Sequence, residues 1–455
     1  MMTLQLSQAA TAIDGQLRGA DLRFTGVSTD TRSLHPGQLF FALRGPNFDG
    51  HDKLDDAQAA GALAAVVERA MPCALPQLLV ADARRALGAL ARAWRQRFKL
   101  PVLAVTGSAG KTTVKEMLAA IMRTQGPVLA TRGNLNNDIG LPLTLFALDA
   151  SHRAAVLEMG ANHVGDIALL AAIADPQVGV ITLCAPSHLE GFGSIEGVAR
   201  TKGELFAGLP ADGVAILNIE DQQASLWRQL AGARRVLSFG SGADFSAHDI
   251  RTTSDGSVFT LRAPQGTADI VLKHRGLHNV RNALAAAAAA SAAGVALSDI
   301  QRGLAEVASV SGRLQYRDGV AGCRLIDDSY NANPASVAAA IAVLASEAGP
   351  RWLVFGDMRE LGPDAADYHR EVGAQAAAAG IAMLFTFGSL ARHAAERFTG
   401  ESQHGNSHQE LLAAMRAALS RRATPPPTIL IKGSRAMALD QVANALAAGS
   451  AVACC

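Results

Sequence analysis

The stretch that decides the fold is residues 102–113, which read VLAVTGSAGKTT. An apolar run leads directly into a turn with two glycines, and a helical pattern follows over Thr112–Met122. Gly107 and Gly110 lack a Cβ atom, so the backbone can curl there and direct successive N–H groups at one anion. The helix N-terminus adds partial positive charge at the same point. The stretch predicts a phosphate-binding loop of the short G-x-x-G-K-T form, because Val105 stands where a strict Walker A sequence has its first glycine.

Around this loop, short apolar runs alternate with longer helical patterns. Runs typical of buried parallel strands are Val102–Val105, Ala154–Leu157 and Val178–Leu183, and the helical patterns include Asp166–Ala174. The alternation begins at Leu100-Pro101. It indicates a central, doubly wound, mostly parallel α/β sheet that carries the phosphate loop.

Two further segments flank this sheet. Residues 1–99 mix short apolar runs with turns and end in a helical pattern over Arg84–Phe98, which predicts a small α/β domain. After Ser311-Gly312-Arg313 a third α/β segment begins, with strand candidates at Arg324–Ile326, Trp352–Phe355, Met383–Phe387 and Thr428–Ile431. We therefore expect three domains, residues 1–99, 100–312 and 313–455, the last of them Rossmann-like. The length agrees, because 455 residues at roughly 150 per domain give three.

Composition and charge exclude several classes of protein. With 49% hydrophobic and 18% charged residues the chain is not intrinsically disordered. A net charge of +1 provides no overall field to recruit nucleic acid. We therefore expect the basic residues in the second half of the Arg84–Phe98 pattern and just after it to form a solvated face; they are Arg92, Arg95, Arg97 and Lys99.

The cysteines, the N-terminal residues and the longest apolar stretch together predict a cytoplasmic protein. The five cysteines are scattered and odd in number, which suits a reducing compartment; they are Cys73, Cys184, Cys323, Cys454 and Cys455. Residues 1–17 lack a basic region followed by an apolar one, so we expect no export signal. The apolar stretch Ala283–Leu297 is mostly alanine and too short for a bilayer span, so we expect a packed helix there.

Side chains at the expected ligand edge of the central sheet suggest a nucleotide and metal site. Lys111 is placed to reach terminal phosphates, and Thr112 to offer its hydroxyl to magnesium. Glu158 directly follows a predicted strand, at the carboxyl end where open α/β sheets bind ligands, and His188 follows the next strand. Lys202 fits a metal site poorly, because an ammonium has three donors and no acceptor; taken alone it indicates a phosphate-binding or surface lysine.

Several longer motifs resemble a known family. Thr106–Thr113, Asn134–Asn137, Glu158–Gly160, His188–Gly193 and Gly276–Asn279 resemble motifs of the Mur ligases of peptidoglycan precursor synthesis. A second set resembles the branch that adds D-alanyl-D-alanine; it comprises Val27–Arg32, Asp327–Pro334, Gly356–Gly362 and Lys432–Arg435. The resemblance covers essentially the whole chain. It implies an ATP-dependent ligase that joins D-alanyl-D-alanine to UDP-N-acetylmuramoyl-tripeptide through an acyl phosphate, with ADP and phosphate released.

The resemblance also implies cofactors and the residues that bind them. ATP is implied on the loop residues Gly107, Ser108, Ala109, Gly110, Lys111, Thr112 and Thr113. Further ATP contacts are implied for Asn279 and Asn282 on the adenine side, Arg313 on the phosphates and Asp328 on the ribose. Two magnesium ions are implied, one on Thr112 and Glu158 and a second on His188. Lys202 matches a lysine that is carbamylated in this family, which turns the cation into an acceptor. Lys111, Glu158, His188 and Lys202 form the implied catalytic set.

The substrates are implied at the two flanking domains. The uridine-nucleotide pocket of the first domain resembles a set made of Ser28, Asp30, Thr31, Arg32, Gly45, Asp49 and His51. Chemically, Arg32 suits a diphosphate, whereas Asp49 and His51 also suit a purely turn-fixing role. Asn134, Asn136 and Asn137 are either turn residues or substrate contacts. The stretch implied to face the dipeptide is Tyr330, Asn331 and Asn333, with Lys432 near its carboxylate. We expect a monomer that binds these small molecules, without nucleic acid and without a membrane span.

Several alternatives stay open at this point. Asp328, His188 and water are all candidates for the general base, and the tripeptide can end in meso-diaminopimelate or L-lysine. A folylpolyglutamate-synthase-like ligase would share the ATP loop but would need no uridine domain. A GTPase-like switch would need a guanine-specifying Asn-Lys-x-Asp stretch, which the sequence lacks.

Overall fold

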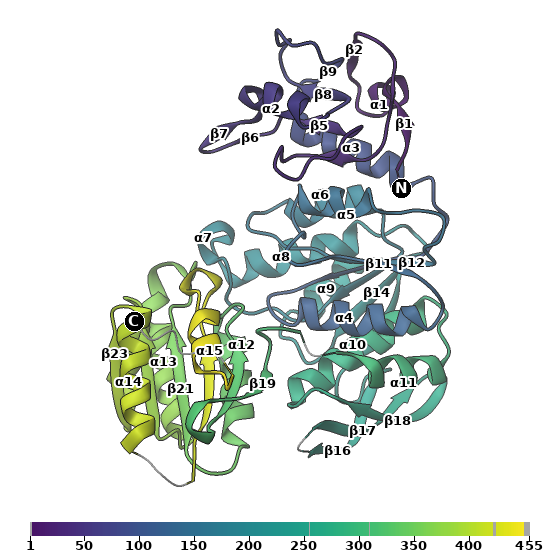
Figure 1. Ribbon diagram of the computed structural model, residues 1–455. Coiled ribbons are helices and arrows are strands. Elements are labelled where there is room, and N and C mark those ends of the chain that lie inside the picture. Colours follow the sequence, from purple (N-terminus) through teal and green to yellow (C-terminus); the bar gives the residue numbers. More distant parts are fainter. Residues whose placement is uncertain (1, 254, 309, 422–424, 450–455) are drawn as a thin grey trace.

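The computed structural model describes residues 2–253, 255–308, 310–421 and 425–449, which form three domains (Figure 1). Each domain is built around its own mostly parallel sheet, so the predicted three-domain α/β fold is confirmed. Cys73, Cys184 and Cys323 are free thiols. Cys454 and Cys455, with the other last residues of the third predicted segment, lie outside the described residues.

The central sheet has six parallel strands in the order β11-β12-β10-β13-β14-β15. Their bounds are β10 (Val102–Thr106), β11 (Val128–Ala130), β12 (Ala154–Glu158), β13 (Val178–Ile181), β14 (Val214–Asn218) and β15 (Arg235–Phe239). Every residue of β10, β12 and β13 is buried, which accounts for their continuous apolar runs. The chain passes from β12 across β10 to β13, so the loop after β10 lies at the switch in strand order where such sheets bind ligands.

Helices cover both faces of this sheet. The helices of this domain are α4 (Lys111–Arg123), α5 (Gly140–Leu145), α6 (Asp166–Ala174), α7 (Leu189–Phe192), α8 (Ile195–Ala207), α9 (Ala224–Ala231), α10 (Leu277–Ala292) and α11 (Leu297–Glu306). One hydrophobic cluster contains residues of α5, α6 and α8, and another contains residues of α4, α10 and α11. Seven alanines of α10, at positions 283 and 285–290, are buried and α10 packs on α4, so most of the apolar stretch Ala283–Leu297 is the packed helix that we expected. No helix in the described ranges is long and apolar enough to cross a membrane.

A three-stranded antiparallel sheet, which the sequence patterns did not indicate, completes the central domain. Its strands are β16 (Ser246–Thr253), β17 (Gly256–Ala263) and β18 (Gly266–Leu272). Phe259, Leu261 and Ile270 join the cluster beneath α10, whereas most of β16 is exposed. The sheet extends the core that supports α10 and α11.

The N-terminal domain has a five-stranded sheet in the order β2-β9-β8-β5-β4, in which only β2 is antiparallel to its neighbour. The strands are β2 (Gln16–Arg18), β4 (Val27–Ser28), β5 (Leu39–Phe41), β8 (Ala64–Val67) and β9 (Gln77–Leu79), and the helices are α1 (Leu6–Ala12), α2 (Leu54–Ala59) and α3 (Ala83–Arg95). Two short pairs are β1 (Leu4–Gln5) with β3 (Arg23–Phe24), and β6 (Arg44–Gly45) with β7 (Phe48–Asp49). Helix α3 packs on α5 and α6 of the central domain, so one hydrophobic cluster runs through both domains.

The predicted solvated basic face is wrong for one of its four residues, Arg95, which is buried. Arg92, Arg97 and Lys99 are exposed, but Arg95 retains only 5% of its exposure. Its guanidinium donates to the carbonyls of Ala174 (2.9 Å) and Asp175 (3.1 Å) at the end of α6. The last carbonyls of a helix have no partner within that helix, so an arginine from the neighbouring domain satisfies them.

We expect Arg95→Ala to lower the free energy of unfolding by roughly 2–3 kcal/mol, because buried carbonyls lose a charged donor. Urea denaturation measures the change. Arg92→Ala, an exposed position in the same helix, is the matched control and should change stability by less than about 0.5 kcal/mol. Equal effects of the two substitutions would contradict a bridging role for Arg95.

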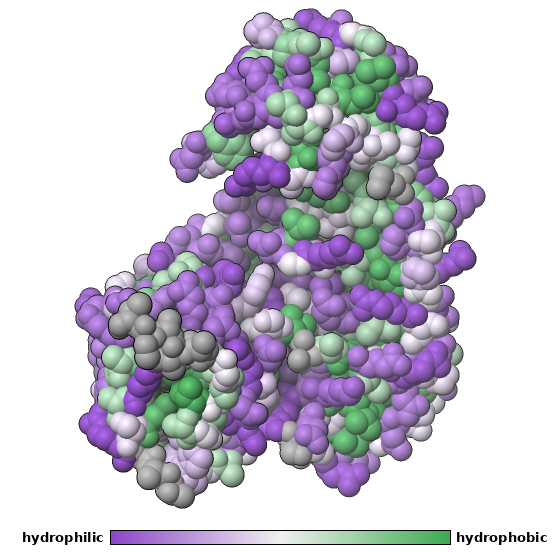
Figure 2. Space-filling model, viewed as in Figure 1, coloured by the Kyte–Doolittle hydropathy of each residue, from purple (hydrophilic) through white to green (hydrophobic). Residues whose placement is uncertain are grey.

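The C-terminal domain has a six-stranded sheet in the order β19-β20-β24-β21-β22-β23, parallel except for the pair β19-β20. Its strands are β19 (Gln315–Asp318), β20 (Arg324–Asp328), β21 (Arg351–Gly356), β22 (Met383–Phe387), β23 (Glu401–Gly405) and β24 (Thr428–Lys432). Its helices are α12 (Pro334–Ala345), α13 (Ala365–Ala378), α14 (His408–Arg421) and α15 (Asp440–Leu446). The predicted strands of this segment are all present. Figure 2 shows the surface hollowed between this domain and the central one.

Candidate active site

A cavity of about 630 Å³ is lined by residues of both the central and the C-terminal domain. Every site residue predicted in these two domains lines it: residues 107–113, Asn134, Asn136, Asn137, Glu158, His188, Lys202, Asn279, Asn282, Arg313, Asp328, Tyr330, Asn331, Asn333 and Lys432. The residues predicted in the N-terminal domain, from Ser28 to His51, are not part of this lining. The cavity therefore gathers residues that are more than 300 positions apart in the sequence.

The loop after β10 needs both of its glycines. Gly107 has φ +143°, and a Cβ atom there would lie 1.9 Å from Thr182 Oγ1. Gly110 has φ +80°, and its Cβ would lie 2.6 Å from Asn282 Oδ1. Helix α4 begins at the next residue, Lys111, whose ammonium donates to the Gly107 carbonyl at 2.7 Å. The helix N-terminus and a lysine thus meet at one loop, which is the arrangement that binds phosphates.

Glu158, the last residue of β12, lines the cavity and is held there by hydrogen bonds. It is only 3% exposed. Its carboxylate accepts hydrogen bonds from Thr112 Oγ1 (2.7 Å) and Asn136 Nδ2 (2.8 Å), and its backbone N–H donates to Thr131 Oγ1 (3.0 Å). A carboxylate and a hydroxyl therefore lie side by side beneath the phosphate loop.

The neighbouring asparagines have different contacts. Asn137 Oδ1 accepts from the N–H groups of Ile139 and Gly140, which is a turn contact at the start of α5. Asn136 instead links its loop to the Glu158 carboxylate. No side-chain hydrogen bond is seen for Asn134 within the described residues, and this residue faces the cavity.

Two of the lysines that line the cavity, Lys111 and Lys202, are destabilised as cations. Burial lowers the pKa of Lys111 below its usual value; Glu158 opposes this shift and Arg313 adds to it. Burial, followed by the charge of Lys111, lowers the pKa of Lys202 to about 7. Within the described ranges no acceptor hydrogen-bonds to Lys202 Nζ, which lies 5.4 Å from the centre of the Phe192 ring. Lys202 is therefore a buried amine without a counter-ion in contact.

The C-terminal domain contacts the phosphate loop directly. Arg313 Nη2 donates to Thr112 Oγ1 at 2.8 Å, and its guanidinium stacks 4.3 Å from the centre of the Tyr330 ring. Asn333 Nδ2 donates to the Ser108 carbonyl at 3.0 Å. Across the same boundary, the carboxylate of Glu360 contacts His188 Nδ1, while burial lowers the pKa of that histidine.

Lys432 is already paired within its own domain. Its ammonium lies 2.5 Å from Asp328 Oδ2 and donates to the Asn331 carbonyl at 2.9 Å, and the residue is 2% exposed. These contacts connect the ends of β20 and β24 and fix the segment that faces the loop.

The asparagines predicted on the adenine side lie at the start of α10. Asn279 Nδ2 donates to the Arg275 carbonyl (2.8 Å), and Asn282 Nδ2 donates to Asn279 Oδ1 (3.1 Å). The close approach of Asn282 to Gly110 places this pair beside the phosphate loop.

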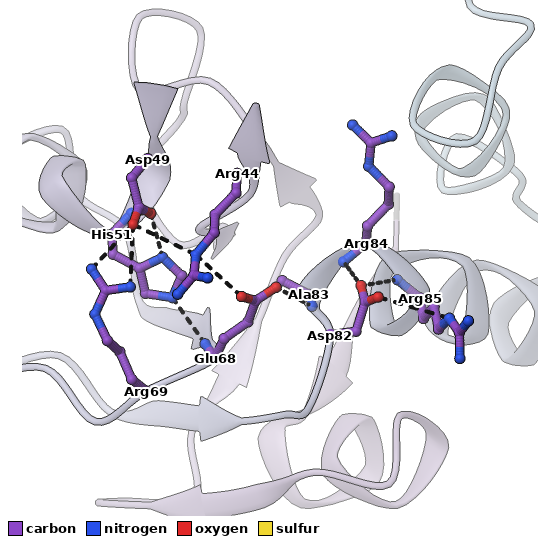
Figure 3. Close-up of polar contacts among 9 residues, drawn as sticks. All are labelled: Arg44, Asp49, His51, Glu68, Arg69, Asp82, Ala83, Arg84 and Arg85. Carbon is purple, nitrogen blue, oxygen red and sulfur yellow. Dashed lines mark hydrogen bonds and ion pairs between the residues drawn. The ribbon is translucent and has the colours of Figure 1, made fainter. Parts of the chain in front are cut away.

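In the N-terminal domain, Asp49 and His51 form a network with two arginines and Glu68 (Figure 3). His51 is buried; its Nδ1 lies 2.6 Å from Asp49 Oδ1, and its Nε2 accepts from the Glu68 N–H at 2.9 Å. Arg69 donates to Asp49, and Arg44 Nε lies 3.3 Å from Glu68. Both ring nitrogens of His51 are occupied, so its contacts are those of a turn residue.

The other predicted residues of this domain range from buried to exposed: Ser28 is 6% exposed, whereas the side chain of Arg32 lies on the surface. Ser28 Oγ donates to the Asp30 carbonyl at 3.0 Å. Arg32 makes a bidentate pair with Asp30, which lowers the pKa of Asp30 to about 2. Thr31 lies between them in the sequence, and Gly45 lies in the β6–β7 hairpin, where a side chain would collide with Phe48.

The donor set of the cavity fits magnesium bound together with a nucleotide. No three His, Cys, Asp or Glu side chains gather into a metal cluster in the described part of the chain. Magnesium, however, usually takes one or two protein ligands and completes its shell with phosphate oxygens and water. Glu158 and Thr112 supply such a pair directly below the loop.

Comparison with known proteins gives a consistent result. The Mur ligase family catalytic domain matches residues 23–95, the Mur ligase middle domain residues 105–290, and the Mur ligase glutamate ligase domain residues 312–435. The chain belongs to the Mur ligase family. Among relatives, the UDP-N-acetylmuramoyl-tripeptide–D-alanyl-D-alanine ligase of Escherichia coli is 44% identical over 98% of this chain and 99% of its own length.

Solved Mur ligase structures agree over the same length. A crystal structure of MurF from Acinetobacter baumannii has a TM-score of 0.95 at 35% identity, covering 98% of this chain and 99% of that one. MurF from Thermotoga maritima in complex with ADP has a TM-score of 0.81 at 28% identity, covering 92% and 96%. This Mur ligase is therefore of the MurF type and, like its family, an ATP-dependent ligase.

Sequence reasoning missed several residues of the Mur ligase cavity. Arg84 of α3 lines it and pairs with Asp138 at 3.0 Å, so the N-terminal domain also reaches this site. His278 lines it too, and burial lowers the pKa of that imidazole to about 4, with nearby Lys432 adding to the shift. His278 belongs to the Gly276–Asn279 motif, so its place in the sequence could have indicated a role in the site. Arg84 is part of a helical pattern only, and nothing in that pattern indicates that it reaches the cavity.

Proposed function

We propose that this chain joins D-alanyl-D-alanine to UDP-N-acetylmuramoyl-tripeptide at the expense of ATP and through an acyl phosphate, which gives the UDP-N-acetylmuramoyl-pentapeptide precursor of peptidoglycan. The observation that carries this assignment is the shared cavity. It sets the phosphate loop and Glu158 of the central domain against Arg313 and Tyr330 of the C-terminal domain. Full-length identity of 44% to a ligase of this specificity supports the choice of substrates.

ATP is proposed to bind with its phosphates on residues 107–113. The loop amides, the N-terminus of α4 and Lys111 provide positive charge there. Arg313 already contacts Thr112 and is proposed to reach the phosphates from the C-terminal side. Asn279 and Asn282 are proposed on the adenine side and Asp328 on the ribose.

Two magnesium positions are proposed. Thr112 and Glu158 would hold the first, and His188 and a carbamate on Lys202 the second. A carbamate forms on a neutral amine, and the burial of Lys202 favours the neutral form. When bound, the two ions supply charge stabilisation for the anionic oxygens that react.

The reaction is proposed to have two steps. The terminal carboxylate of the tripeptide attacks the γ-phosphorus of ATP, and the bond to ADP breaks. The D-alanyl-D-alanine amine then attacks the acyl carbon, phosphate leaves, and the amine loses a proton. Holding the reactants in line can supply about 7–11 kcal/mol of the barrier reduction. Lys111 and Arg313 offset the repulsion between the two anions of the first step.

Each flanking domain is proposed to present one substrate. Ser28, Asp30, Thr31, Arg32 and Gly45 are proposed at the uridine nucleotide, with Asp49 and His51 holding the adjoining turn. Asn134, Asn136 and Asn137 are proposed to border the tripeptide. The residues proposed to face the dipeptide are Tyr330, Asn331 and Asn333. Lys432 is proposed to hold this segment in place, because its ammonium contacts the Asp328 carboxylate and the Asn331 carbonyl. One chain contains every part of this site, so we propose a monomer as the working unit.

Phosphate release tests the assignment. ATP, magnesium, the nucleotide tripeptide and D-alanyl-D-alanine are mixed with the enzyme, and each component is omitted in turn. We expect release only from the complete mixture. Release that does not need D-alanyl-D-alanine, or that proceeds equally with glutamate in its place, would contradict the proposed specificity.

A further inference from the structure

The loop after β21, residues 357–362, is held rigidly in the C-terminal domain. Asp357 is buried, and its Oδ1 accepts from the N–H groups of Leu390 (3.0 Å) and Ala391 (2.7 Å). The Met358 N–H donates to His369 Nε2 at 2.9 Å, and the Arg359 N–H donates to Ser434 Oγ at 2.9 Å. Three consecutive residues are thus anchored before the loop reaches its tip.

The tip of this loop, Glu360, crosses to the central domain. The Leu189 N–H donates to the Glu360 carbonyl at 2.8 Å, and the Glu360 carboxylate contacts His188 Nδ1. Figure 1 shows α7, which begins at Leu189, on the side of the central domain that faces the C-terminal domain. Glu360 and His188 have φ +65° and +51°, a conformation that few residues other than glycine adopt. Outliers of this kind gather at functional sites.

The contact determines how the histidine can act. A carboxylate in contact with Nδ1 favours the tautomer with the proton on that nitrogen, which leaves the lone pair on Nε2. Metal-binding histidines usually have such a partner, which fixes the ring and its tautomer. Among the described residues nothing hydrogen-bonds to His188 Nε2, and His188 lines the cavity. The carboxylate comes from the other domain, whereas the histidine belongs to the central one.

We propose that Glu360 is a positioning residue that orients His188 for the second magnesium, so that this position is completed only when the C-terminal domain docks. This role rests on the proposed function. It explains why a rigid loop presents a carboxylate at the one histidine of the predicted catalytic set. It also couples completion of the metal site to the approach of the domain that brings the dipeptide.

Metal binding without turnover tests this role. Free Mn²⁺ is titrated by electron paramagnetic resonance in the presence of a non-hydrolysable ATP analogue, with wild-type enzyme, Glu360→Ala and Glu360→Gln. We expect Glu360→Ala to weaken one of two ions by about 10–100-fold and to leave the other unchanged. Glu360→Gln keeps an oxygen acceptor and should retain most of the affinity. His188→Ala should weaken the same ion, and the double variant should show no additional loss.

Glu396→Ala is the matched control. Glu396 Oε1 lies 2.6 Å from His393 Nδ1 in the same domain, and neither residue lines the cavity. This control should bind both ions as the wild type does. Unchanged Mn²⁺ binding in Glu360→Ala, or tighter binding, would overturn the positioning role, because Glu360 would then be only an interdomain contact or a competitor of the metal. A wild-type enzyme that binds a single ion would instead refute the two-metal proposal, and the Glu360 role with it.

Discussion

Lys202→Ala should reduce ligation by at least ~10²-fold, the range seen when one electrostatic contributor is removed from an active site. Lys202 is buried and its ammonium has no acceptor in contact within the described ranges, so as a plain lysine it would place an uncompensated cation beside Lys111. Carbamylation would replace that cation with an oxygen ligand for magnesium. Alanine can provide neither group, whereas the fold should tolerate the smaller side chain.

Two further measurements separate the carbamate from a simple need for lysine. Short carboxylates such as formate or acetate, added to Lys202→Ala, should restore part of the phosphate release, and they should not affect the wild type. Burial lowers the pKa of Lys202 to about 7, so the neutral amine that takes up CO₂ becomes scarcer as the pH falls below 7. Wild-type activity at low bicarbonate should therefore decline on the acidic side. A fully active Lys202→Ala enzyme would refute the carbamate role.

Local patterns predicted the parts of the fold that have two buried faces. The runs at residues 102–105, 154–157 and 178–183 became β10, β12 and β13, because parallel strands covered on both sides consist of consecutive apolar residues. The sheet β16–β18 was not predicted. Seven residues of β16 are exposed or half-buried, so it lacks the apolar run that identified the other strands.

The candidate site was predictable within each domain but not between domains. The loop follows β10, Glu158 ends β12 and His188 comes after β13; these three strands are neighbours, so sheet topology alone brings the three parts to one edge. No local pattern shows that Arg95 will cover the end of α6, that Arg84 will reach the cavity, or that Glu360 will contact His188. Those contacts depend on which helix faces which domain. The same limit applies to Lys432, because nothing in the sequence around it shows that its ammonium forms an ion pair with Asp328.

Lys111→Ala should abolish ligation while the fold stays intact. Lysine at the first position of a helix opposes the positive helix N-terminus, and burial already lowers its pKa, so its charge costs stability until an anion arrives. Among the described residues its one side-chain hydrogen bond goes to the Gly107 carbonyl. We therefore expect an unchanged or slightly higher melting temperature for Lys111→Ala without nucleotide, and a kcat at least ~10²-fold lower.

The melting temperature in the presence of a non-hydrolysable ATP analogue distinguishes a phosphate-binding role from a general structural one. A ligand that binds the native state stabilises it in proportion to its affinity. The analogue should raise the melting temperature of the wild type clearly and that of Lys111→Ala much less, whereas Lys53→Ala, an exposed lysine of the N-terminal domain, should respond as the wild type does. If Lys111→Ala turned over normally, or gained as much stability from the analogue as the wild type, the loop would not be the phosphate site. Because the lysine carries its charge at a cost in the free protein, binding and stability should change in opposite directions, a pattern that a merely destabilising substitution does not produce.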